Sequence, residues 1–207
     1  MCKIIFTILA IFCVIANVSY ASNIQTITPI FSQYVVASFP SEFQTVFEDS
    51  NSSQYIRESV LKGESSSAWS QMITITGFKG VSKLRPSLTP EIFLDGIADS
   101  FKSVCGTSFN RINVSDAKID GYDGFVAIIS CGTANALNSE TALVSVVKGD
   151  RDYYTIQWAE RSQLSNKPLV IDREKWKSRL KELSPIRLCK RIKGEVAPYP
   201  SCLNPND

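Results

Sequence analysis

Apolar residues recur at helical spacing along one segment of the chain and alternate with polar ones along the segments around it. The helical segment begins at Thr89-Pro90-Glu91, where threonine caps free N–H groups, proline suits the first helical position and glutamate favours the positive end of the dipole. Gly106 is a typical stop signal. The pattern therefore predicts a helix over 89–105. Its expected core stripe consists of Phe93, Ile97, Phe101, Val104 and Cys105.

A turn at 120–124 precedes a strand over 125–131. Period-two alternation places Phe125, Ala127, Ile129 and Cys131 on one face of this strand. Cys105 and Cys131 then both lie on core-facing surfaces of neighbouring elements. We predict a disulfide between them, which ties the helix to the sheet.

The same alternation predicts further strands, and a second capped stripe predicts a closing helix from Asp172 to Leu183. Two pairs of strands are separated by turn-like segments and are expected to form hairpins. The stretch 22–41 carries two prolines and is expected to be an arm with at best a short strand over 34–37. The predicted strands outside 125–131 are 43–47, 55–61, 69–78, 111–119, 142–147 and 153–159.

This order of elements predicts an α+β fold. Short turns between consecutive strands imply antiparallel pairing, so we expect a single twisted antiparallel sheet of about six to seven strands. The long helix follows the third strand, and the C-terminal helix packs on the sheet. The expected organisation is a signal peptide at 1–21, the arm at 22–41, the α+β domain at 42–186 and a disulfide-clipped tail at 187–207.

The amino terminus has the pattern of a secretory signal peptide. Lys3 is followed by an apolar run from Ile4 to Val18 and then by Ser19-Tyr20-Ala21, which predicts cleavage after Ala21. The alternatives are an uncleaved anchor, for which the run is short, and a lipoprotein signal at Cys13, where the preceding residues are bulky. The favoured interpretation predicts a secreted or periplasmic protein with no transmembrane segment after cleavage.

Signal cleavage would leave four cysteines, and an even number in an exported chain indicates disulfides. With Cys105 paired to Cys131, Cys189 pairs with Cys202. The alternatives are four buried thiols or a metal site, although the sequence has no Cys-x-x-Cys pair and no histidine.

The chain has 207 residues and no histidine, and its formal charge is +2. Near neutrality gives no case for nucleic acid as a partner. Without histidine, the commonest general acid or base and His-based triads are excluded. We therefore expect no cofactor and lean towards a protein that is not an enzyme.

Three motifs carry a chemical interpretation that we set aside. Ser59 with Lys62, and Ser145 with Lys148, match Ser-x-x-Lys, but both copies fall on predicted strands, where positions three apart face opposite sides. Asp116, Asp120 and Asp123 surround a turn and are candidate calcium ligands, yet turns favour aspartate on backbone grounds alone. Asn51 and Asn113 are glycosylation acceptors in a eukaryotic host.

Two groups of residues are candidate ligand or partner surfaces. Trp69, Tyr154 and Trp158 could line an aromatic groove, although core packing is the simpler interpretation. A basic stretch includes Lys175, Arg179, Lys190 and Arg191 and could meet an acidic partner or anionic lipid, although a solvated helix face explains it more simply.

The element order from Phe43 to Leu183, with the 69–78 strand before the 89–105 helix and 172–183 as a closing helix, resembles the PsbP, Mog1 and DcrB-like group. The resemblance implies an antiparallel sheet between helices and a non-enzymatic accessory role. Our leading hypothesis is an exported, disulfide-stabilised binding protein that acts through a protein partner at the cell envelope or outside the cell. The alternatives are a secreted carboxylate-dependent hydrolase and a carrier of small ligands or lipids that uses the aromatic groove.

Overall fold

The structure is a computed structural model that describes residues 23–116, 118–134 and 137–203. The signal-peptide prediction concerns residues 1–21 and lies outside the described residues. Within the described ranges, no helix combines the length and the apolar character needed to cross a membrane.

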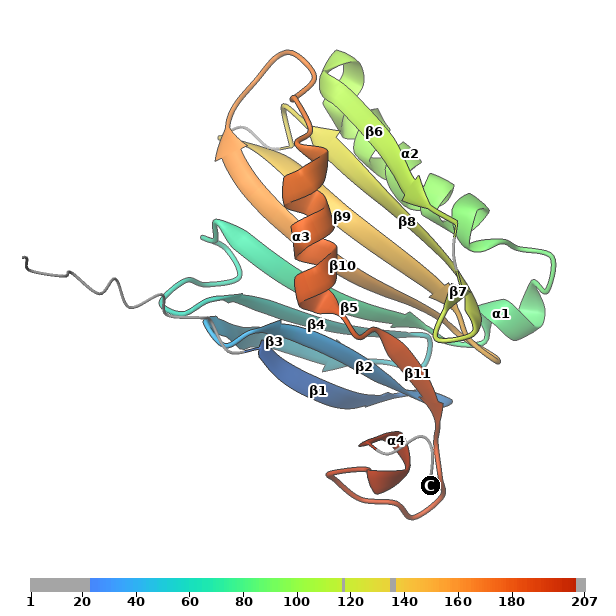
Figure 1. Ribbon diagram of the computed structural model, residues 1–207. Helices are drawn as coiled ribbons and strands as arrows, with labels where there is room; N and C mark the ends of the chain where they lie inside the picture. The colour runs from blue at the N-terminus through green and yellow to red at the C-terminus, as the bar shows by residue number, and fades with distance from the viewer. Residues whose placement is uncertain (1–22, 117, 135–136, 204–207) are drawn as a thin grey trace, which may run out of the picture.

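The elements alternate between long antiparallel strands and a few helices (Figure 1). The strands are β1 (Asn23–Ile30), β2 (Gln33–Pro40), β3 (Phe43–Ser50), β4 (Gln54–Leu61), β5 (Gln71–Phe78), β6 (Phe109–Ser115), β7 (Lys118–Ile119), β8 (Tyr122–Cys131), β9 (Asn138–Lys148), β10 (Tyr153–Gln163) and β11 (Arg187–Lys190). The helices are α1 (Val81–Leu84), α2 (Pro90–Cys105), the 3₁₀ turn η1 (Gly106–Ser108), α3 (Arg173–Leu183) and α4 (Pro200–Leu203).

The α+β class is confirmed, but the prediction of one sheet is wrong. The described strands form an eight-stranded sheet in the order β3-β4-β5-β10-β9-β8-β6, with β7 beside β8, and a separate three-stranded sheet in the order β1-β2-β11. All pairings are antiparallel, as expected. The predicted hairpins β3–β4 and β9–β10 both form.

The second sheet is built from the segments expected to be an arm and a tail. Every residue of β2 is buried, because both of its faces are covered. Val35, Ala37 and Phe39 face the main core, while Tyr34 and Val36 pack against Cys202 and the C-terminal segment. Residues 23–40 and 187–190 are therefore part of the packed body. Their apolar runs are too short, and too often interrupted by proline, for the sequence to predict that these segments pack in the body of the protein.

The eight-stranded sheet is covered on both faces (Figure 1). Helix α2 packs on one face, over β8 and β9. Helix α3 and the three-stranded sheet pack on the other. Alternate residues of β8 and β10 therefore enter two different cores, which explains the unbroken apolar run Phe125–Ile129 in β8.

Helix α2 begins as predicted, with the Thr89 hydroxyl accepting a hydrogen bond from the N–H of Ile92 at 3.2 Å. Its buried line is shifted from the expected stripe. Leu94 and Ala98 are its most buried residues, whereas Val104 lies at the margin and is 65% exposed. Phe93, Ile97 and Phe101 flank the buried line and pack on the same core as Phe125, Ala127 and Ile129.

Both predicted disulfides are present. Cys105–Cys131 joins the end of α2 to the end of β8, with 5.3 Å between the Cα atoms. Cys189–Cys202 joins β11 to α4, with 5.6 Å between the Cα atoms. The first bridge links a helix to the sheet it covers, and the second holds the C-terminal segment against the outer face of β2.

Candidate functional site

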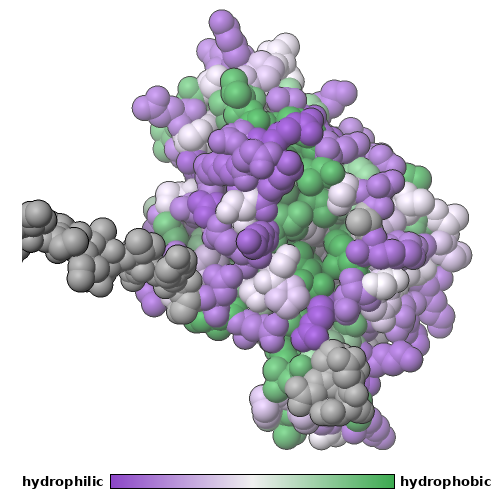
Figure 2. Space-filling model, viewed as in Figure 1, coloured by the Kyte–Doolittle hydropathy of each residue, from purple (hydrophilic) through white to green (hydrophobic). Residues whose placement is uncertain are grey.

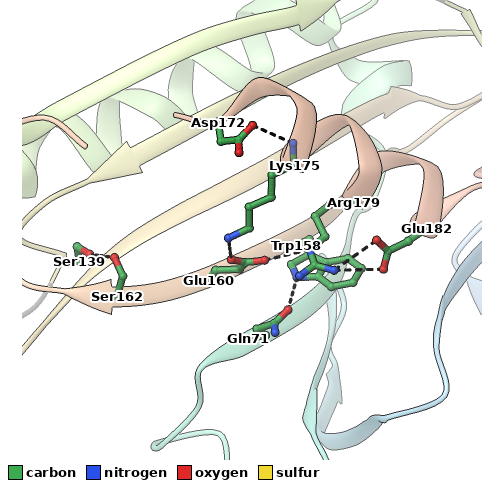
Figure 3. A network of polar contacts seen from close by, with 9 residues as sticks. All are labelled: Gln71, Ser139, Trp158, Glu160, Ser162, Asp172, Lys175, Arg179 and Glu182. Atoms are coloured by element: carbon green, nitrogen blue, oxygen red, sulfur yellow. Dashed lines mark hydrogen bonds and ion pairs between the residues drawn. The ribbon is translucent and has the colours of Figure 1, made fainter. Parts of the chain in front are cut away.

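The basic residues that the sequence singles out on α3 are neutralised within the protein. Figure 3 shows Lys175 and Arg179 converging on Glu160, which projects from β10. The Arg179 Nε lies 3.0 Å from a Glu160 oxygen, and its Nη1 lies 3.3 Å from Glu182. Asp172 caps the same helix by accepting from the N–H groups of Glu174 and Lys175. These cations therefore fasten α3 to the sheet.

Two of the three candidate aromatic residues are interior. Trp158 is 1% exposed, donates a hydrogen bond from Nε1 to the Gln71 side chain at 3.1 Å, and is covered by the Arg179 guanidinium 4.4 Å from its ring centre (Figure 3). Tyr154 is fully buried, and its hydroxyl donates to the Ile30 carbonyl and to Asp152, both at 3.2 Å. Burial raises the pKa of Tyr154 far above its usual value. Neither ring offers a face to a ligand.

Trp69 lies on the other side of the sheet. It precedes β5 and packs with the core beneath α2, whereas Tyr154 and Trp158 belong to the core beneath α3. The Arg161 guanidinium lies 3.7 Å from the centre of the Trp69 ring, and its Nε lies 3.8 Å from Glu140. Burial raises the pKa of the Glu140 carboxyl, and the charge of Arg161 opposes this shift. The three aromatic residues thus do not form one groove.

The motifs set aside from the sequence do not form reactive groups. Ser145 is buried, while Lys148 donates from Nζ to the carbonyl oxygens of Pro86 and Leu88. Asp123 pairs with Lys118 at 2.5 Å, and this hydrogen bond lowers the pKa of the Asp123 carboxyl. Asp120 accepts from the N–H of Leu188. No group of three or more histidine, cysteine, aspartate or glutamate residues suited to a metal ion occurs among the residues placed.

A buried carboxylate organises the opposite end of the sheet from Glu160. Asp152, in the turn between β9 and β10, is 2% exposed. It accepts hydrogen bonds from the N–H and the hydroxyl of Ser32, from the N–H of Gly80 at 2.6 Å and from the hydroxyl of Tyr154. Four donors satisfy a buried charge that would otherwise be costly. Asp152 thereby joins the β1–β2 turn, the β5–α1 junction and the β9–β10 turn.

Phe31 occupies an unusual position in the β1–β2 turn. Its φ is +50°, in the left-handed region that bulky residues rarely adopt. Its carbonyl accepts a hydrogen bond from Arg191 Nη1 at 3.0 Å, and its ring centre lies 5.6 Å from Lys79 Nζ. Phe31 therefore contacts two cations that are far apart in sequence, Lys79 and Arg191.

These residues surround a cavity of about 600 Å³, which we call the cationic pocket. Its cations are Lys79, Arg151 and Arg191, all exposed. Among the described residues, none of the three forms an ion pair with a carboxylate. The lining carboxylate, Asp152, is already saturated by the donors described above. The remaining lining residues are Pro29, Phe31, Ser32, Ser50 and Gly80.

The sequence identified only Arg191 of this trio, with Lys190 beside it on β11. Lys79 and Arg151 stand in separate turns, and neither belongs to a basic run around a common motif. The β5–β10 pairing aligns Phe78 with Tyr153 and so brings the ends of those two turns together. The pairing register between strands that are distant in sequence brings the cations of the site together. A local sequence pattern carries no information about that register.

An apolar groove of about 460 Å³ lies beside α3. Its apolar walls come from Ile119, Val126, Leu180, Pro185 and Ile186. Figure 2 shows green apolar surface next to the purple polar face of this region. The groove lies away from Trp158, so it differs from the aromatic groove expected from the sequence.

The fold and the cationic pocket define a disulfide-bonded α+β protein with two stacked antiparallel sheets and a cluster of three exposed cations. No family model matches the chain, and no curated protein matches it in sequence. The Saccharomyces cerevisiae Ran-binding protein Mog1p is similar in structure, with a TM-score of 0.44 and 13% identity over 79% of this chain and 87% of that one. Mog1p belongs by name to the group that the element order from Phe43 to Leu183 resembles, and the similarity concerns topology alone.

Proposed function

We propose that this chain is an exported, non-enzymatic binding protein that recognises an anionic group of a protein partner through the cationic pocket. The single observation that supports this is the contrast between two sets of cations. Lys175 and Arg179 are paired with carboxylates of the protein, whereas Lys79, Arg151 and Arg191 converge on a cavity with no carboxylate partner among the described residues.

Three positive charges around one cavity destabilise the free protein, and a binding partner removes this destabilisation. Like charges repel one another across a shared cavity, and an incoming anion both relieves this repulsion and accepts their hydrogen bonds. Complementary charge of this kind also speeds association and selects partners. Lys190, the last residue of β11, precedes Arg191 in sequence and does not line the pocket.

The rest of the proposal rests on sequence and covalent structure. The apolar amino terminus supports export, and two disulfides suit an oxidising compartment. The lack of histidine and the paired state of the buried acidic residues support a binding role over catalysis.

The experiment is chemical cross-linking in the secreted or envelope fraction of the source cells. We would compare the natural chain with the Arg151→Glu/Arg191→Glu variant. Lys177→Glu is the matched control, because Lys177 is exposed on α3 and pairs only with Glu174. The natural chain and the control should capture the same partner, and high salt or the double reversal should abolish capture. An identical set of cross-linked proteins for all three chains would contradict the proposal.

A further inference from the structure

The charge balance of the cationic pocket points to a particular anion. We infer that the group it receives is a phosphate monoester carried by the partner, an inference that rests on the proposed function. Three cations, less the one lining carboxylate of Asp152, leave a net charge of +2 on the pocket. A phosphate monoester carries a charge of about −1.5 to −2 at neutral pH, whereas a carboxylate carries only about −1. The monoester therefore neutralises the pocket and the carboxylate does not.

The types of donor agree with this assignment. Two of the three cations are arginines, whose planar guanidinium groups bind phosphate oxygens in pairs, and the third is a lysine, which acts as a compact point charge. A phosphoryl group offers three acceptor oxygens, one for each cation, while a carboxylate offers two.

Two of the three cations contact Phe31 before any ligand arrives. Arg191 is fixed by the Phe31 carbonyl, and Lys79 lies beside the Phe31 ring. Phe31 is held in turn by Ser32, whose N–H and hydroxyl bind the buried Asp152 carboxylate. Phe31 and Asp152 are thus positioning residues, and a preorganised site loses less entropy on binding.

The size of the cavity favours a phosphate that is attached to a larger body. A volume of about 600 Å³ is within the usual range for ligand pockets and exceeds what a phosphoryl group fills. Pro29 and Phe31 provide apolar wall for the residue that bears the phosphate. A compact cluster of three cations on a chain of formal charge +2 suits a peptide better than a membrane surface, which attracts extended basic patches.

Three short peptides that differ only at their central residue test the inference on the full oxidised chain. The central residue is phosphoserine, glutamate or serine, and binding is measured by isothermal titration calorimetry. At about pH 7.5 the phosphoserine peptide should bind about tenfold more tightly than the glutamate peptide. At about pH 5 this preference should shrink, because the second ionisation of the phosphate lies near pH 6.

The pH dependence is informative because the chain has no histidine, the side chain whose usual pKa lies in this range. The charged side chains that line the pocket are Lys79, Arg151, Arg191 and Asp152. Glu140, whose pKa is raised, lines a different cavity with Phe101 and Cys105. A change in affinity between the two pH values therefore reports on the ligand.

Single substitutions identify the residues that bind. Lys79→Gln, Arg151→Gln and Arg191→Gln should each weaken phosphoserine binding about fivefold to tenfold, while Lys177→Gln leaves it unchanged. Equal affinity for the glutamate and phosphoserine peptides would overturn the phosphate assignment and leave the proposed function in place. Failure of both anionic peptides, or binding only to vesicles that contain phosphatidic acid, would overturn the assignment to a phosphorylated partner. Only an identical set of cross-linked proteins for the natural chain, the double-reversal variant and the Lys177→Glu control, tested separately, would overturn the proposed function itself.

Discussion

The guanidinium of Arg179 lies 4.4 Å from the centre of the Trp158 ring and covers it from the side of α3. The same side chain pairs with Glu160, so one residue closes the core and neutralises a nearly buried carboxylate. Helix α3 carries few apolar residues, and this contact explains how so polar a helix stays on the sheet.

Replacing Arg179 by alanine should therefore destabilise the protein by about 1–2 kcal/mol, through loss of the stacking contact and of one ion pair to Glu160. Lys177→Ala removes an exposed pair with Glu174 and should cost less than about 0.5 kcal/mol. Urea unfolding of both variants measures the difference. Equal effects would show that α3 is held by its apolar residues alone.

The disulfide between α2 and β8 should contribute to stability by restricting the unfolded chain. It closes a loop with a sequence separation of 26 residues. The chain-entropy model gives a stabilisation of about 3.5 kcal/mol for a loop of this size. The Cys105→Ser/Cys131→Ser variant should unfold at a correspondingly lower urea concentration, while the Cys189–Cys202 bridge still forms and can be verified by peptide mapping. A variant as stable as the natural chain would contradict the bracing role.

Two glycines offer a matched pair for testing local packing. A Cβ atom on Gly132 would lie 2.1 Å from the backbone carbonyl oxygen of Ser165, a contact that only a backbone shift relieves. Gly132→Ala should cost about 2–4 kcal/mol. Gly96 lies in α2, and a Cβ atom added there would meet no other atom within 4 Å. Gly96→Ala should stabilise the protein by about 0.5–1 kcal/mol, as expected at an exposed helical position. Thermal unfolding of both variants measures whether Gly132→Ala lowers and Gly96→Ala raises the stability of the protein.

Glu140 should make stability fall as the pH rises through the acidic range. Burial raises the pKa of its carboxyl in the folded protein above the unfolded value of 4.5. Between these two pKa values the folded state binds more protons than the unfolded state, so the free energy of unfolding decreases with increasing pH. This destabilisation is absent at pH values below the pKa of Glu140 in the unfolded chain, and it is complete above the pKa of Glu140 in the folded protein.

Glu140→Gln removes this titration. Relative to the natural chain, the variant should gain stability as the pH is raised from about 4 to about 7, because only the natural chain acquires a buried charge. Denaturant unfolding at several pH values measures the difference between the two chains. A difference that stays constant with pH would show that Arg161 compensates the Glu140 charge completely.

Local sequence patterns predicted the parts of the fold that depend on interactions between nearby residues or residues on one face of an element. The Thr89 and Asp172 caps, the β9–β10 hairpin and the Cys105–Cys131 bridge all follow from residues near one another in sequence or on one face of an element. The second sheet could not be predicted in the same way. Strand β1 is mostly exposed, β11 has four residues, and both depend on β2, which is buried only because other segments cover both of its faces.

The candidate site shows the same limit. The sequence left Trp158 open between an aromatic groove and the core, with core packing as the simpler interpretation, and the structure places it in the core beneath Arg179 from a distant helix. Lys79, Arg151 and Arg191 belong to three different segments, and strand register together with the hydrogen bonds of Asp152 brings them around one cavity. Information of this kind resides in tertiary pairing and has no counterpart in a short stretch of sequence.

The most direct test of binding at the cationic pocket is to follow backbone amide NMR signals of the isotopically labelled, oxidised chain while the phosphoserine peptide is added. The account predicts saturable shifts concentrated at Phe31, Ser32, Lys79, Gly80, Arg151 and Arg191. Shifts concentrated instead around Leu180 and Ile186 in the apolar groove, or no shifts at saturating peptide, would contradict it.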